Sequence, residues 1–306
     1  MQLTACADPD NDAAAAVTVL APQLEVYASA SELLQQGEVD AVMIATPHHV
    51  LMEIALAAID KGKHVMAEKP IAVSEWEAHQ IEEAAAEAGI CYMAGYSLRF
   101  FVAQRQVRDL LADGAIGEIQ AVTAGIGQGP RSGWFARPEM GGALLYLGSH
   151  LVDEVLWFVQ DAPVQVYADV RYDPDTGADE TTNLQILFAR GAVAQCLVTQ
   201  AVEGWFDCVT LHGRNGHVSL SSSNWLQYEI SVRSTVLPPY SQPTTIHPVM
   251  GGDPLMMMLV PEVEEFAAAI WDKRPPAITA HDGRQVLKIL DAVRKSARTR
   301  ATVRVD

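Results

Sequence analysis

The sequence has few cysteines, no long apolar run and no sign of a targeting segment. Its four cysteines (Cys6, Cys91, Cys196 and Cys208) are scattered, with no C-x-x-C spacing. Each therefore suits a small packed side chain in a reducing compartment better than a disulfide framework. No apolar stretch approaches the length of a membrane helix, and no signal peptide is evident. We expect a cytoplasmic protein that makes no membrane contact.

Basic residues are also scarce. Lysine and arginine number 21 against 38 aspartates and glutamates, which gives a net charge of −17. Such a surface repels polyanions, so the composition disfavours binding to nucleic acid or to anionic membranes. The chain has 306 residues, of which 49% are apolar and 19% charged. This is a globular composition, long enough for two domains with cores.

The first third alternates strand and helix signals. Ser74, with Glu77 three residues later, predicts a helix N-cap, and Gly62 and Gly89 predict helix ends. Strand followed by helix and strand again is typical of a parallel α/β sheet. The expected strands are 40–45, 64–67 and 90–94, and the expected helices are 50–61 and 75–88.

Glu68, Lys69 and Pro70 stand directly after one of these strands. Ligands bind at the carboxyl edge of a parallel sheet, and a lysine there can hold a substrate hydroxyl or lower its pKa. The alternative is a surface ion pair before a turn.

The residues after Gly95 indicate a different architecture. Closely spaced strand signals with short turns predict a mainly antiparallel sheet, after a long helix at 143–159. Arg190-Gly191 and Asn215-Gly216 are the expected hairpin turns. Segment 125–129 contains G-x-G but opens no helix, so we interpret it as a loop, and we interpret 238–254 as a long loop. The expected strands are 117–124, 164–172, 182–189, 193–202, 208–212 and 226–233.

Several motifs occur together in an order that resembles a known family. The segments VDAVMIATP, HVMAEKP, GYSLRF and GGALLYLGSHLVDEVLW look like those of the Gfo/Idh/MocA family of nicotinamide-dependent sugar and polyol dehydrogenases. The resemblance extends over nearly the whole chain. It implies an incomplete Rossmann-like domain at 1–95 and a substrate and oligomerisation domain at 96–306, with an antiparallel sheet and helices on one face. By analogy, the outer face of that sheet implies a homodimer or homotetramer.

The sequence departs from this family at its amino end. The family opens with a strand, a G-x-G-x-x-G turn and a helix that cradle the cofactor pyrophosphate. Residues 1–10 resemble instead the family's second strand, with Asp8 as the acidic residue that binds the adenosine ribose. Two explanations remain open. Met1 is an internal methionine of a longer protein, or the chain is a natural variant that does not bind the cofactor normally.

A second departure concerns the site itself. The family pattern places an aspartate four residues before a histidine, whereas this chain has Tyr146 before His150. Residues four apart share a helix face, so both are expected to face a substrate above Lys69. His150 suits a general base, Tyr146 a hydrogen-bond donor, and Asp153 a replacement for the missing aspartate. The alternative is that these residues form one side of a helix that only packs against its neighbours and has no catalytic role.

These features predict an oxidoreductase that moves a hydride between NAD and a sugar, inositol or related polyol. NADP is less favoured because the Asp8 carboxylate repels a 2′-phosphate. No metal site is expected. The alternative is a non-catalytic binding or regulatory protein that keeps the fold. Besides the catalytic trio Lys69, His150 and Tyr146, the expected cofactor contacts are Asp8, Thr46, Pro47, His48, Glu68, Lys69 and Ser97, and the expected substrate contacts are Lys69, Arg131, Trp134, Tyr146 and Asp153.

Overall fold

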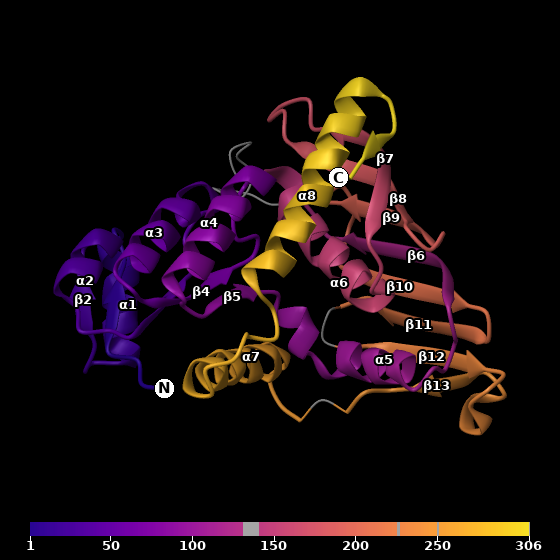
Figure 1. Cartoon of the computed structure of the whole chain (residues 1–306), viewed down its shortest axis with the longest axis horizontal. Coiled ribbons are helices and arrows are strands. Elements are labelled where there is room, and N and C mark those ends of the chain that lie inside the picture. Colours follow the sequence, from indigo (N-terminus) through magenta and orange to yellow (C-terminus); the bar gives the residue numbers. More distant parts are fainter. Residues whose placement is uncertain (131–140, 225–226, 250, 306) are drawn as a thin grey trace.

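A computed structural model describes residues 1–130, 141–224, 227–249 and 251–305. Figure 1 shows a parallel α/β layer built from the first hundred residues, beside a large sheet formed by the later strands. The long helix α8 (Ala280–Thr299) runs between the two and contacts α4, α6 and β7. This confirms the expected fold class, a parallel sheet followed by a mainly antiparallel one.

The parallel layer contains two separate sheets. One pairs β1 with β2, and the other has the order β3-β4-β5, all parallel. No strand joins β1 to β3 within the described parts of the chain. The strands are β1 (Ala5–Ala7), β2 (Glu25–Tyr27), β3 (Ala41–Ile44), β4 (His64–Glu68) and β5 (Tyr92–Gly95).

Helices connect these strands, and local sequence explains where they begin. The side chains of Asp10, Ser29 and Ser74 accept backbone N–H groups of the first turns of α1, α2 and α4. The remaining helix of this layer, α3, begins after Pro47 and has no side-chain cap. The helices are α1 (Asn11–Leu20), α2 (Ala30–Gln36), α3 (His48–Asp60) and α4 (Glu75–Ala88).

The second layer is one sheet of nine strands, in the order β13-β12-β11-β10-β6-β9-β8-β7-β14. Its pairs are antiparallel except for β6 with β9, which run parallel. Arg190-Gly191 and Asn215-Gly216 lie at the hairpin turns, as expected. The strands are β6 (Ile119–Gly127), β7 (Pro163–Tyr172), β8 (Asp179–Phe188), β9 (Val193–Thr199), β10 (Phe206–Gly213), β11 (Gly216–Ser222), β12 (Glu229–Ser234), β13 (Thr244–Ile246) and β14 (Val303–Arg304).

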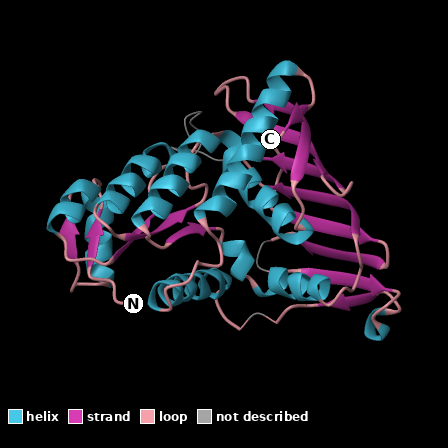
Figure 2. Ribbon diagram, in the orientation of Figure 1, coloured by secondary structure: helices cyan, strands magenta, loops and turns pink. Residues whose placement is uncertain are grey.

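Helices lie on one face of this sheet. Figure 2 shows α5, α6 and α8 on that face, and among the described residues no helix covers the other. The element η1 leads from β5 into α5, and α7 packs against η1. Their bounds are η1 (Ser97–Phe100), α5 (Val102–Ala112), the π-helical turn η4 (Leu144–Gly148), α6 (Ser149–Val159), η5 (Pro238–Tyr240) and α7 (Pro254–Trp271).

Two loop predictions were wrong. Gly125 and Gly127 belong to the buried end of β6, and an added Cβ at Gly127 would collide with the ring of Phe206. The glycines therefore let an aromatic ring pack directly on a strand, which period-2 alternation cannot reveal. Segment 238–254 holds the short helix η5 and the edge strand β13 between its loop stretches.

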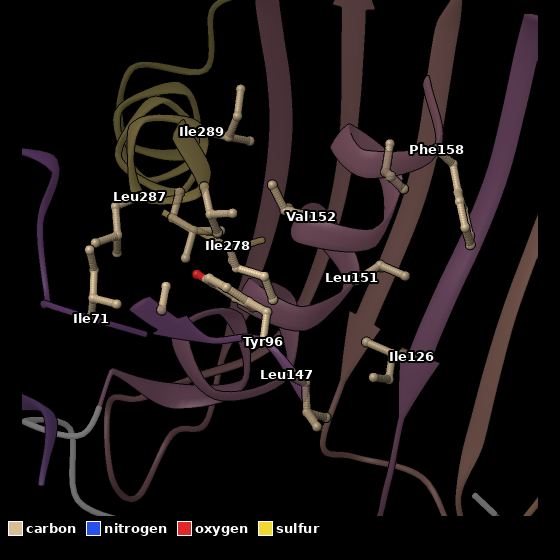
Figure 3. Close-up of a cluster of buried hydrophobic side chains, with 14 of the residues drawn as sticks. Ile71, Tyr96, Ile126, Leu147, Leu151, Val152, Phe158, Ile278, Leu287 and Ile289 are labelled. Carbon is tan, nitrogen blue, oxygen red and sulfur yellow. The ribbon is translucent and has the colours of Figure 1, made fainter. Parts of the chain in front are cut away.

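One apolar core joins the two layers. Figure 3 shows Tyr96, at the end of β5, lying among Ile278, Leu287 of α8 and Val152 of α6. All four side chains are fully buried. Burial on this scale fixes α6 and α8 against β5, so the two layers share their packing at the point where the candidate site forms.

The helical unit 142–159 is capped from a distant strand. The backbone N–H of Leu144 donates to the Asp179 carboxylate of β8 over 2.5 Å. Gly142 makes this approach possible, because its φ is +63° and an added Cβ would strike the Asp179 carboxylate. Gly177 has a similar φ of +73° but open space around it.

This pair of glycines gives a matched test. We expect Gly142→Ala to lower the free energy of unfolding by about 2–4 kcal/mol. The alanine is strained in the left-handed backbone conformation, and its Cβ also displaces the Asp179 carboxylate from the helix. Gly177→Ala should cost only about 1 kcal/mol, the strain alone. Urea denaturation measures both. Equal losses would show that Asp179 does not cap this helix.

Candidate active site

The end of β4 brings Lys69 against the helical unit of the second layer. The Lys69 side chain is 8% exposed. Its Nζ donates to the backbone carbonyl oxygen of Tyr146 over 2.9 Å and lies 4.5 Å from the centre of the Tyr146 ring. A hydrogen bond and a cation–π contact therefore hold the ammonium at the carboxyl edge of the parallel sheet.

His150 lies one turn further along the same helical unit. Its ring meets the ring of Tyr96 edge-on, with centroids 6.4 Å apart. Its Nδ1 is buried and has no hydrogen-bond partner among the described residues. Burial, followed by the positive charge of Lys69, lowers the pKa of His150 well below its usual value. The imidazole is therefore neutral at pH 7, which differs from the expected titration near neutrality.

Tyr146 contacts Lys69 through its ring and its backbone, whereas the sequence predicted a hydroxyl that donates to substrate. It lies in the π-helical turn η4, not in regular α-helix. Its ring and carbonyl oxygen both contact Lys69. The structure thus brings together the three residues predicted to be catalytic, Lys69, Tyr146 and His150. It adds a contact to the backbone that side-chain spacing could not predict.

Asp153, which was expected to support His150 or to contact substrate, has a different partner in the structure. Asp153 is 2% exposed and pairs with Arg99 over 2.6 and 2.9 Å. Asp153 therefore makes no hydrogen bond to Nδ1 of His150, and its contact with a substrate stays a prediction. The pairing with Arg99 was not foreseen, because the spacing along one helix does not show which distant residue will pair with a buried carboxylate.

The predicted cofactor contacts gather at the ends of several parallel strands. Asp8 follows β1 and accepts the backbone N–H of Asp10 over 2.8 Å. Thr46 follows β3, and its buried Oγ1 has no partner among the described residues. Pro47 is exposed and His48 is buried, at the uncapped start of α3, and Ser97 begins η1 after β5. An unpaired hydroxyl and an uncapped helix start fit a polar, anionic cofactor.

Two acidic residues lie beside this edge. Glu68 is exposed, yet the surrounding protein removes part of its hydration and so raises its pKa. The positive charge of Lys69 acts in the opposite direction but is outweighed. Glu262 of α7 is fully buried, and neither carboxylate oxygen has a described partner. Burial, followed by the charge of Glu68, raises the pKa of Glu262 to about 8. Sequence analysis missed Glu262, although a glutamate that directly follows the apolar run 254–261 was a usable signal.

Other predictions have simpler outcomes. Arg131 and Trp134, predicted to contact substrate, lie outside the described residues. Among the residues that the structure does describe, no group of three or more His, Cys, Asp or Glu side chains could hold a metal ion. Within those same ranges, no helix is long and apolar enough to cross a membrane.

Comparison with known proteins identifies the family. Residues 1–96 match the model of the oxidoreductase family with an NAD-binding Rossmann fold, and residues 104–219 match the GFO/IDH/MocA C-terminal domain. The two models belong together and follow in order along the chain. The protein belongs to the Gfo/Idh/MocA family of oxidoreductases.

Individual relatives match over part of their length. An uncharacterized oxidoreductase of Streptococcus pneumoniae is 33% identical over 54% of this chain and 45% of its own. The 1,5-anhydro-D-fructose reductase of Ensifer adhaerens is 32% identical over 61% of this chain and 59% of its own. These matches cover about half of each relative.

Solved structures share the fold along the whole chain. Levoglucosan dehydrogenase, in a complex with NADH and levoglucosan, is similar with a TM-score of 0.87 and 23% identity. The match covers 99% of this chain and 90% of that one. At this identity the likeness shows the fold, and it agrees with the architecture of two layers described above.

The buried carboxyl of Glu262 predicts a pH-dependent stability. Its pKa is about 8 in the fold against an ordinary 4.5, so folding takes up a proton between these values. The free energy of unfolding should therefore fall as pH rises from about 5 to 8. We expect Glu262→Gln to be more stable than the original chain at pH 8.5, by about 2–5 kcal/mol, and equal to it near pH 4.5.

Thermal unfolding at several pH values measures this difference. Glu264→Gln, at an exposed neighbour, is the control and should show no such trend. A difference between Glu262→Gln and the original chain that is constant with pH would contradict a neutral, buried Glu262.

Proposed function

We propose that the protein is an NAD-dependent dehydrogenase that acts on a CH–OH group of a sugar, inositol or related polyol. The observation that carries this proposal is the contact of Lys69 with Tyr146, one helical turn before His150, with the charge of Lys69 acting on His150. Family membership supports hydride chemistry. The similarity to a 1,5-anhydro-D-fructose reductase supports a sugar as the substrate class.

Each side chain has a distinct part in this chemistry. NAD, held by the polar groups at the ends of β1, β3 and β5, would supply the acceptor for the hydride of the substrate carbon. His150 takes the hydroxyl proton, because its imidazole is neutral and a neutral imidazole can accept a proton. The Lys69 ammonium stabilises the negative charge that develops on the substrate oxygen. The substrate becomes a carbonyl compound, and the hydride and the proton are both accounted for.

The charge of the cofactor layer supports NAD over NADP. Residues 1–96 contain 15 aspartates and glutamates but only three lysines and no arginine. Asp8 lies at the end of β1, where it can accept hydrogen bonds from a ribose. An additional 2′-phosphate would meet this carboxylate and an acidic surrounding, which is unfavourable.

A non-catalytic binding protein is the second candidate. The split between β1 and β3 favours it, because the described strands leave unpaired edges in the middle of the layer that should hold the cofactor. The neutral His150 and the buried Lys69 favour catalysis instead, since a scaffold gains nothing from burying an ammonium beside an imidazole.

Turnover of site variants separates these candidates. In a screen of polyols with NAD, we expect Lys69→Ala and His150→Ala each to lower kcat about 100-fold or more, because each removes stabilisation of the reacting oxygen or its proton. Lys61→Ala, at an exposed lysine of the same layer, is the control. Unchanged kcat in both site variants, with wild-type activity present, would refute these roles.

Calorimetric titration tests the cofactor assignment. We expect NADH to bind more tightly than NADPH. Asp8→Asn should lower the ratio of the Kd for NADPH to the Kd for NADH about tenfold, because it removes the charge of the side chain but keeps an acceptor oxygen. Asp12→Asn, in the first turn of α1, is the control. An unchanged ratio in Asp8→Asn would show that Asp8 does not face the adenosine ribose. If neither NADH nor NADPH bound, the result would favour the non-catalytic candidate.

A further inference from the structure

Two polar contacts tie the parallel layer to the helical unit that carries His150. Lys69, after β4, donates to the carbonyl oxygen of Tyr146 over 2.9 Å. Arg99, in η1 after β5, donates to both carboxylate oxygens of Asp153. His150 lies between these two attachment points in the sequence. The position of its imidazole relative to Lys69 therefore depends on both contacts.

The Arg99 contact has the geometry of a strong pair. Its Nε and Nη2 bond Asp153 over 2.9 and 2.6 Å, as two parallel hydrogen bonds. The side chains of Arg99 and Asp153 are only 10% and 3% exposed. The Arg99 guanidinium also lies 5.7 Å from the ring of Trp157, one turn beyond Asp153 on α6. A buried bidentate pair leaves little freedom for α6 to slide or rotate.

A third element completes this arrangement. The Nη1 of Arg99 donates to Asp282 of α8 over 3.2 Å. Asp282 is itself fixed by the Thr279 backbone N–H and hydroxyl, over 2.8 and 2.6 Å. Just before it, the backbone N–H of Ala94 in β5 donates to Ile278 over 3.0 Å. Arg99 therefore joins η1, α6 and α8 at one buried point.

The electrostatics agree with a permanent charge at this point. Burial opposes the charge of Arg99, but Asp153 and Asp282 outweigh it and raise the Arg99 pKa. Burial likewise opposes ionisation of Asp282, but Arg99 and the hydrogen bonds from Thr279 together outweigh it and lower the Asp282 pKa. At Asp153, burial outweighs Arg99 and raises the pKa. An uncharged side chain at position 99 would leave the buried Asp153 carboxylate and the partly exposed Asp282 carboxylate without this cation, which is costly at Asp153.

We propose that Arg99 is a positioning residue for the reaction: by holding Asp153 it sets the placement of His150 relative to Lys69. This rests on the proposed dehydrogenase function. Arg99 touches neither substrate nor cofactor in this role and acts only through α6. Errors of about 1 Å in such placement can lower turnover about 100-fold, so even a conservative replacement should be visible.

Arg99→Lys is the test, because it keeps the charge but cannot form two parallel bonds. We expect kcat to fall about 10- to 100-fold, while KM and the Kd for NADH change less than about threefold. NMR titration of isotope-labelled histidine should show the pKa of His150 moving up towards its usual value as α6 loosens. A normal kcat together with an unmoved His150 titration would overturn the proposal.

Arg284→Lys is the matched control. Arg284 also ties α8 to the parallel layer, through Glu75 and Glu82 of α4 over 2.6 and 3.1 Å, but it lies away from His150. We expect its kcat and His150 titration to stay within about twofold of the original. If Arg284→Lys lowered kcat as much as Arg99→Lys at similar loss of stability, Arg99 would be merely structural, and the proposal would fail.

The proposal can be judged apart from the proposed function. If the original chain shows no dehydrogenase turnover, the function fails, and the His150 titration still decides whether Arg99 positions the imidazole. If Arg99→Lys does not fold, Asp282→Asn replaces it, since this change removes the charge from one arm of the contact and keeps an oxygen that can accept from Thr279. That variant should then move the His150 titration in the same direction and by a smaller amount, and no movement would overturn the proposal.

Discussion

The buried ammonium of Lys69 is the interaction on which the candidate site depends. A charge with 8% exposure is stable only if polar groups surround it, and the Tyr146 carbonyl oxygen and ring supply part of that environment. These groups come from the second layer, so the charge is satisfied only when the two layers are docked. Docking also buries His150 and places a cation beside it; burial, followed by this charge, lowers the pKa of His150. The same contact therefore stabilises the interface and contributes to the neutral state of the histidine.

Much of the fold was predictable because its signals are local. The Ser74 cap, the glycine stops and the alternating strands of the second half all act within a few residues, and the structure has them as expected. The prediction failed at Gly125 and Gly127, where the close approach of Phe206 decides the conformation. That ring comes from a strand about 80 residues later. Turn-forming residues packed inside a strand look the same as a loop when only neighbours are considered.

The site was predictable in part for a related reason. Topology places the carboxyl ends of parallel strands together, so Lys69 and the residues after β1 and β3 were expected at one edge. The partner of Asp153 was not predictable, because Arg99 lies 54 positions away and any buried cation would have satisfied the carboxylate. The depressed pKa of His150 was also missed, since burial is a property of the packed layers rather than of the helix that carries the histidine.

The division of the parallel layer has a consequence for how firmly each end of a cofactor would be held. β4, β5 and η1 are tied to the second layer by Lys69, by Arg99 and by the common core. β1, which carries Asp8, pairs only with β2 in the described chain and contacts the rest of the layer through α2. In the proposed binding mode, the nicotinamide would lie against the strands that have more ties to the second layer, and the adenosine against β1, which has fewer. Binding energy at the first end would then serve positioning, because little is lost in ordering it, and selectivity at the adenosine end would come mainly from charge, as proposed for Asp8.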